Sequence, residues 1–170
     1  IDIAERYVAE LGHTIQGFDL HIRSSLRDPH TSRKLGLGSS GATTVAVMQA
    51  ITKIYGVRTG RVDILKLALL AGVAIDPHGS GGDMAAAVFG GWITYSAPDR
   101  RHLARATSAH GSQIAALVSQ HWAGLHIAAL PALQELQLAV AWTGNPARSD
   151  AFTTRLHSTT YDASAYKRFL

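Results

Sequence analysis

Apolar residues recur at helical spacing through much of the chain. Between Asp2 and Leu11 they occupy positions 3, 4, 7, 8 and 11, which lie on one face of an α-helix. Gly12 then ends the pattern, as glycine commonly does after a helix. The same reasoning predicts further helices at Ser40 to Tyr55, Val62 to Ile75, Asp83 to Phe89 and Ala147 to Leu156, and one within Arg101 to His121 that is interrupted near His110 and Gly111.

A different period marks the predicted strands. Phe18, Leu20 and Ile22 alternate with polar residues, which indicates a half-buried strand from residue 18 to 23. Further strands are expected at Trp92 to Tyr95, His126 to Leu130 and Leu136 to Trp142, with Trp92 and Trp142 in the core. Helices and strands alternate along the chain, so the fold class is α/β or α+β.

The composition narrows the class of protein. The chain has 170 residues, of which 46% are hydrophobic and 16% charged, as in globular domains rather than disordered ones. It contains no cysteine, which excludes a disulfide framework and a thiol nucleophile and is compatible with a cytoplasmic location. No apolar run is long enough to span a membrane, and the scattered basic residues form no stripe for nucleic acid. The net charge of +4 suits an enzyme with polyphosphate ligands.

The glycine-rich loop from Gly36 to Gly41 is the strongest chemical signal. Three glycines and two serines occupy six residues (Gly36, Leu37, Gly38, Ser39, Ser40 and Gly41) directly before a predicted helix. Backbone N–H groups at such a turn, together with the positive end of the helix, form a site for phosphate. A turn that merely caps the helix is the alternative.

Other phosphate-binding motifs fit this loop less well. Gly36-x-Gly38-x-x-Gly41 matches the dinucleotide fingerprint, but the polar residues 28–34 before it cannot form the buried strand that the fingerprint requires. The chain has no Gly-Lys-Ser/Thr of a Walker A loop, and it has neither the His-Arg-Asp nor the Asp-Phe-Gly of protein kinases.

A second glycine-rich turn, from Asp76 to Gly82, precedes Asp83. Gly36-Leu37-Gly38-Ser39-Ser40 resembles the phosphate-binding motif of the GHMP kinases, and Ser80-Gly81-Gly82-Asp83 resembles the segment that carries their catalytic aspartate. The stretches 90–95, 96–100 and 141–149 narrow the resemblance to the bacterial-type phosphomevalonate kinases.

The resemblance implies an α+β, two-layer GHMP kinase-like fold. Its N-terminal part would resemble the second domain of a small-subunit ribosomal protein. Residues 1–130 would be most of the N-terminal, ATP-binding domain, and residues 131–170 would begin the C-terminal domain. The catalytic lysine and the last glycine-rich motif of the family would lie before Ile1 and after Leu170.

The resemblance also implies ATP and Mg²⁺ as cofactors and 5-phosphomevalonate as the small-molecule substrate. The loop from Gly36 to Gly41 would bind ATP, Ser40 would ligate Mg²⁺, and Asp83 would be catalytic. Residues expected to contact the substrate are Lys34, Ser80, Gly81, Arg148 and Ser149. The oligomeric state stays open.

Two departures and two alternatives accompany this interpretation. Ser32 stands where the family often has proline, and Gly41 stands where many members have alanine. Another GHMP kinase, acting on mevalonate or a sugar, and a catalytically incomplete binding module are the alternative functions.

Overall fold

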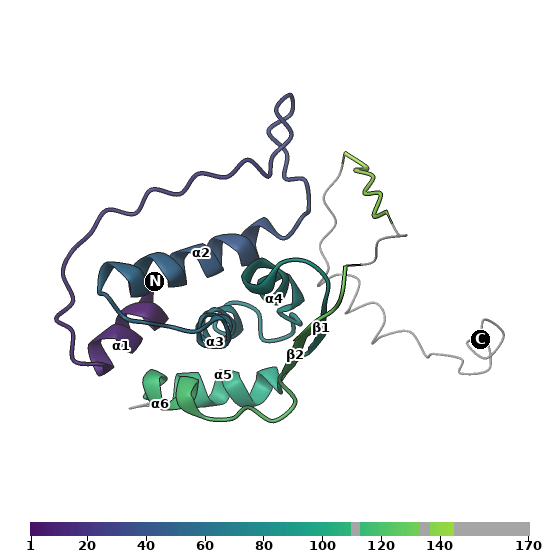
Figure 1. Ribbon diagram of the computed structural model, residues 1–170. Helices are drawn as coiled ribbons and strands as arrows, with labels where there is room; N and C mark the ends of the chain where they lie inside the picture. The colour runs from purple at the N-terminus through teal and green to yellow at the C-terminus, as the bar shows by residue number, and fades with distance from the viewer. Residues whose placement is uncertain (110–112, 133–136, 145–170) are drawn as a thin grey trace.

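The computed structural model describes residues 1–109, 113–132 and 137–144. The described residues form six helices and two strands (Figure 1). The helices are α1 (Asp2–Glu10), α2 (Ser39–Ile54), α3 (Arg61–Val73), α4 (Gly82–Phe89), α5 (Arg100–Ser108) and α6 (Ile114–Ser119). The first four helices confirm the sequence predictions to within two residues at each end. The predicted interruption near His110 is confirmed as well, because α5 and α6 are separate helices.

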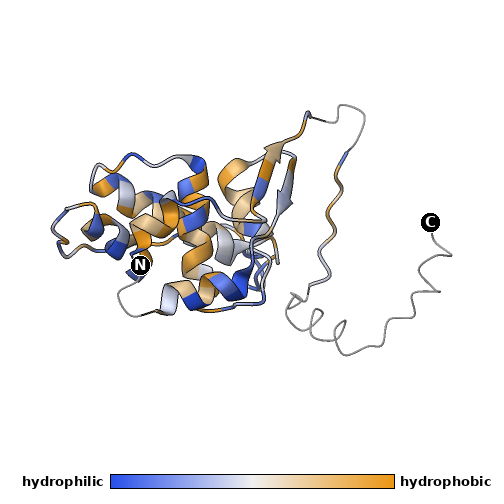
Figure 2. Ribbon diagram, turned by 90° about the horizontal axis from the view of Figure 1, so that it is seen from below, coloured by the Kyte–Doolittle hydropathy of each residue, from blue (hydrophilic) through white to orange (hydrophobic). Residues whose placement is uncertain are grey.

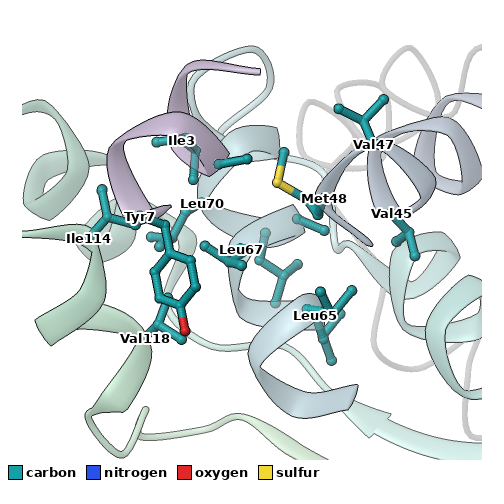
Figure 3. Packing of buried hydrophobic residues seen from close by; sticks show 14 of the residues in the cluster. Ile3, Tyr7, Val45, Val47, Met48, Leu65, Leu67, Leu70, Ile114 and Val118 are labelled. Atoms are coloured by element: carbon teal, nitrogen blue, oxygen red, sulfur yellow. The ribbon is translucent and has the colours of Figure 1, made fainter. Parts of the chain in front are cut away.

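Helix α3 lies at the centre of the helical layer, seen nearly end-on in Figure 1. It contacts each of the other five helices. Its residues are apolar around most of the circumference, and the stretch from Ile64 to Leu70 is entirely buried. A helix that is apolar on all sides must be covered on all sides. Figure 3 shows this packing, with Leu67 and Leu70 of α3 among side chains from α1, α2 and α6.

Lys66 is the polar exception within α3. Its side chain is 7% exposed, and its Nζ donates hydrogen bonds to the carbonyl oxygens of Val118 (2.7 Å) and Gln120 (2.6 Å). The ammonium also lies 5.5 Å from the ring centre of Trp122. Burial lowers the pKa of Lys66, and the Asp63 carboxylate partly opposes that shift. The lysine therefore joins α3 to the C-terminal end of α6, where carbonyl groups lack helical partners.

The strands β1 (Ile93–Ser96) and β2 (His126–Ala129) pair antiparallel, with Ile93 opposite Ala129 and Ser96 opposite His126. Figure 2 shows this small sheet beside the helices, whose apolar residues are concentrated where the helices meet. Mixed helix and antiparallel sheet confirms the α+β class. Both strands agree with the sequence predictions to within one residue.

Two predicted strands are wrong over the described residues. Residues 18–23 and 137–142 have no regular secondary structure and pair with no described strand. A strand is defined by its ladder of hydrogen bonds, and alternating side chains alone cannot supply a partner. Just before the first segment, the backbone of Gln16 is bonded by a side chain rather than by a strand. The Tyr55 hydroxyl accepts a hydrogen bond from the Gln16 N–H at 2.9 Å and donates one to the Gln16 carbonyl.

The two tryptophans expected in the core also differ. Trp92 is 41% exposed and Trp142 is 38% exposed. Each belongs to a segment with few covering elements in the described part of the chain. The helix predicted for Ala147 to Leu156 lies outside the described residues.

Replacing Lys66 with methionine should destabilise the fold by about 1–3 kcal/mol, because the two carbonyl groups lose a charged donor. Urea denaturation of the Lys66→Met variant tests this. Lys53→Met, which removes an exposed lysine of α2, serves as the matched control and should change stability little. An unchanged denaturation midpoint for Lys66→Met would contradict the assigned role.

Asp99 should make stability depend on pH. It is the N-cap of α5, and its carboxylate accepts from the His102 N–H at 3.0 Å. That hydrogen bond holds the pKa of Asp99 below its ordinary value of 3.8. A depressed carboxyl pKa adds stability above the ordinary value, and the contribution disappears as pH falls through the folded value.

The Asp99→Asn variant should therefore be less stable than the wild type at pH 7. The difference should shrink as the pH falls below 3.8. Denaturation midpoints of both proteins across this range provide the measurement. A difference that stays constant with pH would show that the charge of Asp99 contributes nothing.

Candidate functional site

The glycine-rich loop forms the start of α2. Gly38 is the N-cap residue and takes left-handed backbone angles (φ 75, ψ 27), which favour glycine. No N–H between Gly36 and Gly41 donates to another group in the described part of the chain, whereas the Ala42 N–H donates to the Gly38 carbonyl. The loop therefore presents a run of free backbone donors at the positive end of a 16-residue helix.

The two serines of the loop do not cap the helix. The cap position belongs to Gly38, and neither the Ser39 nor the Ser40 hydroxyl forms a hydrogen bond with a described residue. Ser40 is exposed and Ser39 is half-buried. Capping by a serine side chain is thus not observed, although Gly38 of the same turn is the N-cap, and both hydroxyls are available to a ligand.

Asp83 lies directly against this loop. It is the second residue of α4, and the N-cap of that helix is Gly81, again with left-handed angles (φ 76, ψ 10). A Cβ placed on Gly38 would lie 3.2 Å from the Asp83 Cβ. The structure therefore brings together two motifs that are more than 40 residues apart in sequence, at the facing N-terminal ends of α2 and α4 (Figure 1).

Gly41 explains one departure from the family pattern. A Cβ at this position would lie 2.7 Å from Asp83 Cγ and 3.2 Å from the Met84 backbone nitrogen. Contacts below 3 Å require a shift of the neighbouring group. Alanine at position 41 would therefore displace the Asp83 carboxylate from its observed place.

Lys34 reaches the loop from a short hairpin. Arg27 and Lys34 form an isolated antiparallel bridge, and Asp28 accepts from the Thr31 N–H at 2.7 Å inside the turn.

Ser32, in the same hairpin, takes a φ of 55°, which a proline ring cannot adopt. The departure from the family's proline at this position therefore also fits the local backbone.

A cavity of about 490 Å³ lies between this hairpin and α2. It is lined by two cations, four hydroxyl groups and two apolar side chains: Arg27, Lys34, Ser24, Ser39, Ser40, Thr43, Ile22 and Leu26. A more apolar cavity of about 390 Å³ continues along α2, between residues 20–26 and the helix face that carries Thr43, Ala46 and Ala50. Cations and hydroxyls next to free backbone donors favour a phosphorylated ligand, and the apolar continuation could take a less polar part of it.

The turn before Asp83 is held by two side chains, Tyr95 and Arg100, which belong to the stretches 90–95 and 96–100 but had no role predicted from the sequence. The Tyr95 hydroxyl donates to the Ser80 carbonyl at 2.9 Å, and Arg100 Nη2 donates to the Asp76 carbonyl at 3.0 Å. Burial raises the pKa of Tyr95 and lowers the pKa of Arg100. In the sequence, the family-like stretch 96–100 and the N-cap Asp99, directly before Arg100, point to this arginine, but neither predicts its contact with the Asp76 carbonyl.

The remaining predicted residues are placed less completely. Ser80 is exposed, its hydroxyl accepts from the Gly82 N–H at 3.2 Å, and Gly81 is buried. Arg148 and Ser149 lie outside the described residues. The segment before them approaches the hairpin, because Arg33 Nη1 donates to the Gly144 carbonyl at 2.9 Å.

None of the described helices is both long and apolar enough to cross a membrane. Across the described residues, no three His, Asp or Glu side chains cluster as a metal site would require. Asp83 forms no ion pair with any described residue.

Comparison with known proteins agrees with the site geometry. Residues 1–91 match the model of the GHMP kinases N terminal domain. The chain is 37% identical, over 171 aligned residues, to a phosphomevalonate kinase of Streptomyces sp. (strain CL190), covering 100% of this chain and 45% of that protein. It also resembles the crystal structure of a Lin0012 protein from Listeria innocua, with a TM-score of 0.81 and 27% identity over 99% of this chain and 46% of that one.

The chain thus spans somewhat less than half the length of these relatives. The family match covers 91 of its 170 residues and includes both glycine-rich turns and Asp83. The chain belongs to the GHMP kinase family.

Proposed function

We propose that the protein containing this chain is a phosphomevalonate kinase. It transfers the γ-phosphoryl group of ATP to 5-phosphomevalonate and releases 5-diphosphomevalonate and ADP, in the synthesis of isoprenoid precursors. One observation carries the proposal: a free phosphate-binding loop and Asp83 adjoin each other in a chain 37% identical over its whole length to a phosphomevalonate kinase. The cytoplasm is the proposed compartment.

The loop would supply the binding energy for the nucleotide. Free N–H groups from Gly36 to Gly41 would hold the phosphates of ATP, and the Ser40 hydroxyl would ligate Mg²⁺. The metal, when bound, neutralises charge on the phosphate oxygens. Lys34, on the wall of the adjoining cavity, would place a further positive charge beside the phosphates.

The proposed reaction does not require Asp83 to accept a proton, and we assign it a different task. The attacking group is a phosphate oxygen, whose second pKa is near ~6, so it is already ionised at neutral pH. A bare carboxylate would repel that dianion. We infer that Asp83 would instead orient a cation, either Mg²⁺ or a lysine, that offsets the charge of the phosphates. Ser80 and Gly81, at the start of the same helix, would contact the substrate together with Arg148 and Ser149.

The choice of acceptor gives the direct test. The longest natural polypeptide that contains this segment should release ADP from ATP with 5-phosphomevalonate and not with mevalonate, in a coupled ADP assay. Turnover of mevalonate alone would assign the protein to another branch of the family.

The 170-residue chain itself is tested separately by calorimetric titration with Mg-ATP. ATP binding without turnover would describe a catalytically incomplete binding module, whereas turnover would show that this segment suffices.

Replacing Gly41 with alanine should separate stability from activity. Alanine favours a helix over glycine by about 1 kcal/mol, and this gain opposes the crowding of the added Cβ against Asp83 and the Met84 backbone nitrogen, so the urea midpoint should change little. Its added Cβ displaces the Asp83 carboxylate, so kcat should fall toward that of Asp83→Asn, for which we expect a loss of about 100-fold.

Gly17→Ala is the matched control, since a Cβ there meets nothing within 4 Å. It should leave kcat unchanged. A Gly41→Ala enzyme with full activity, or an Asp83→Asn enzyme with full activity, would remove Asp83 from the mechanism.

A further inference from the structure

We propose that Arg100 is a positioning residue for Asp83: it fixes the turn from Asp76 to Gly82 and so determines where α4 begins. Its effect on the reaction rests on the proposed function, whereas its effect on the turn does not. Arg100 is the first residue of α5, and its side chain runs beneath the turn that leads into α4.

The site of Arg100 is built for a guanidinium group. The side chain is only 9% exposed. A Cβ placed on Gly72 would lie 3.4 Å from Arg100 Nη2, and one placed on Gly81 would lie 3.3 Å from Nη1. Both glycines, one in the central helix α3 and one at the cap of α4, border the guanidinium, while the atoms nearest to their added Cβ belong to Met84 (2.7 Å from Gly72) and Leu69.

The turn is fastened at two carbonyl groups. Arg100 binds the Asp76 carbonyl at its start, and Tyr95 of β1 binds the Ser80 carbonyl directly before the cap residue Gly81. Both bonds act on backbone, so they fix the path of the chain rather than the rotamer of one side chain. Asp83 follows Gly81 by two residues, within the first turn of the helix.

The chemistry of Arg100 exceeds what packing needs. Its Nε and Nη1 are buried and have no hydrogen-bond partner in the described part of the chain. Buried donors without partners destabilise a fold, and an apolar side chain of similar size would avoid that cost. The charged groups that act on the guanidinium are the Asp76 and Asp83 carboxylates, with the Tyr95 hydroxyl nearby. The buried guanidinium therefore acts on the turn that begins at Asp76 and leads to Asp83.

The first experiment measures catalysis in the longest natural polypeptide that contains this segment. Arg100→Met should lower kcat by about 100-fold, as expected when a catalytic group is displaced by about 1 Å, with KM for ATP changed less than about threefold. Arg100→Lys restores a positive charge but not the forked donor geometry of a guanidinium, so it should recover part of kcat. The matched control is Arg101→Met. The neighbouring Arg101 side chain is exposed and has no assigned contact, so the kcat of this variant should equal that of the wild type.

The second experiment needs no activity and uses the 170-residue chain. The Ala85 N–H donates to the Gly81 carbonyl at 3.0 Å, so its hydrogen exchange reports on the start of α4. The Ile64 N–H makes the equivalent bond to the Gly60 carbonyl at 3.1 Å, at the start of α3. Arg100→Met should accelerate exchange at Ala85 by at least about tenfold and leave Ile64 unchanged, since only the first turn is braced by the arginine.

The outcomes separate the two proposals. Faster exchange at Ala85 alone supports the positioning role even if the wild-type protein proves inactive with phosphomevalonate, a result that would overturn only the proposed function. Equal acceleration at Ala85 and Ile64 would mean general destabilisation and would overturn the positioning role. A folded Arg100→Met variant with unchanged exchange and unchanged kcat would overturn it as well.

Discussion

The burial of α3 on all sides is the constraint on which the rest of the structure depends. Because the helix from Arg61 to Val73 has no continuous polar face, it requires neighbours around its whole circumference, and the other five helices provide them. The one buried charge on it, Lys66, is matched by carbonyl groups at the end of α6. Packing against this common core also fixes α2 and α4 relative to each other, and both carry functional motifs.

The candidate site follows from how closely those two helices approach. Their N-terminal ends meet where Gly38 and Gly41 leave space for Asp83, so a carboxylate lies beside a run of free backbone donors. The site thereby combines two opposite electrostatic effects on a phosphate: the helix N-termini attract it and the carboxylate repels it. Under the proposed function, a bound cation would offset the repulsion between the carboxylate and the phosphate. The buried Arg100 adds a fixed positive charge on the protein side of the same carboxylate.

Particular residues show which features could be predicted from the sequence and which could not. The helix bounds were predictable because glycines and apolar periodicity are local signals, and Gly12, Gly56 and Gly90 all lie at or just beyond helix ends. The strand predicted at residues 18–23 failed because its alternation says only that one face is buried, and no described strand pairs with it. The exposure of Trp92 and Trp142 was equally beyond reach, since hydrophobicity does not state which elements are present to cover a side chain.

By itself, the sequence determined the positions of the main helices, the mixed α and β content, the glycine-rich loop and the family resemblance, because each depends on residues close together in the chain. Only the tertiary structure decided that Asp83 contacts Gly41, that Ser39 and Ser40 do not cap α2, and that Arg100 and Tyr95 hold the turn before Asp83. The three contacts among these join residues 15, 24 and 42 positions apart in the sequence. They arise from the packing of helices around α3, and local pattern carries no information about such distances.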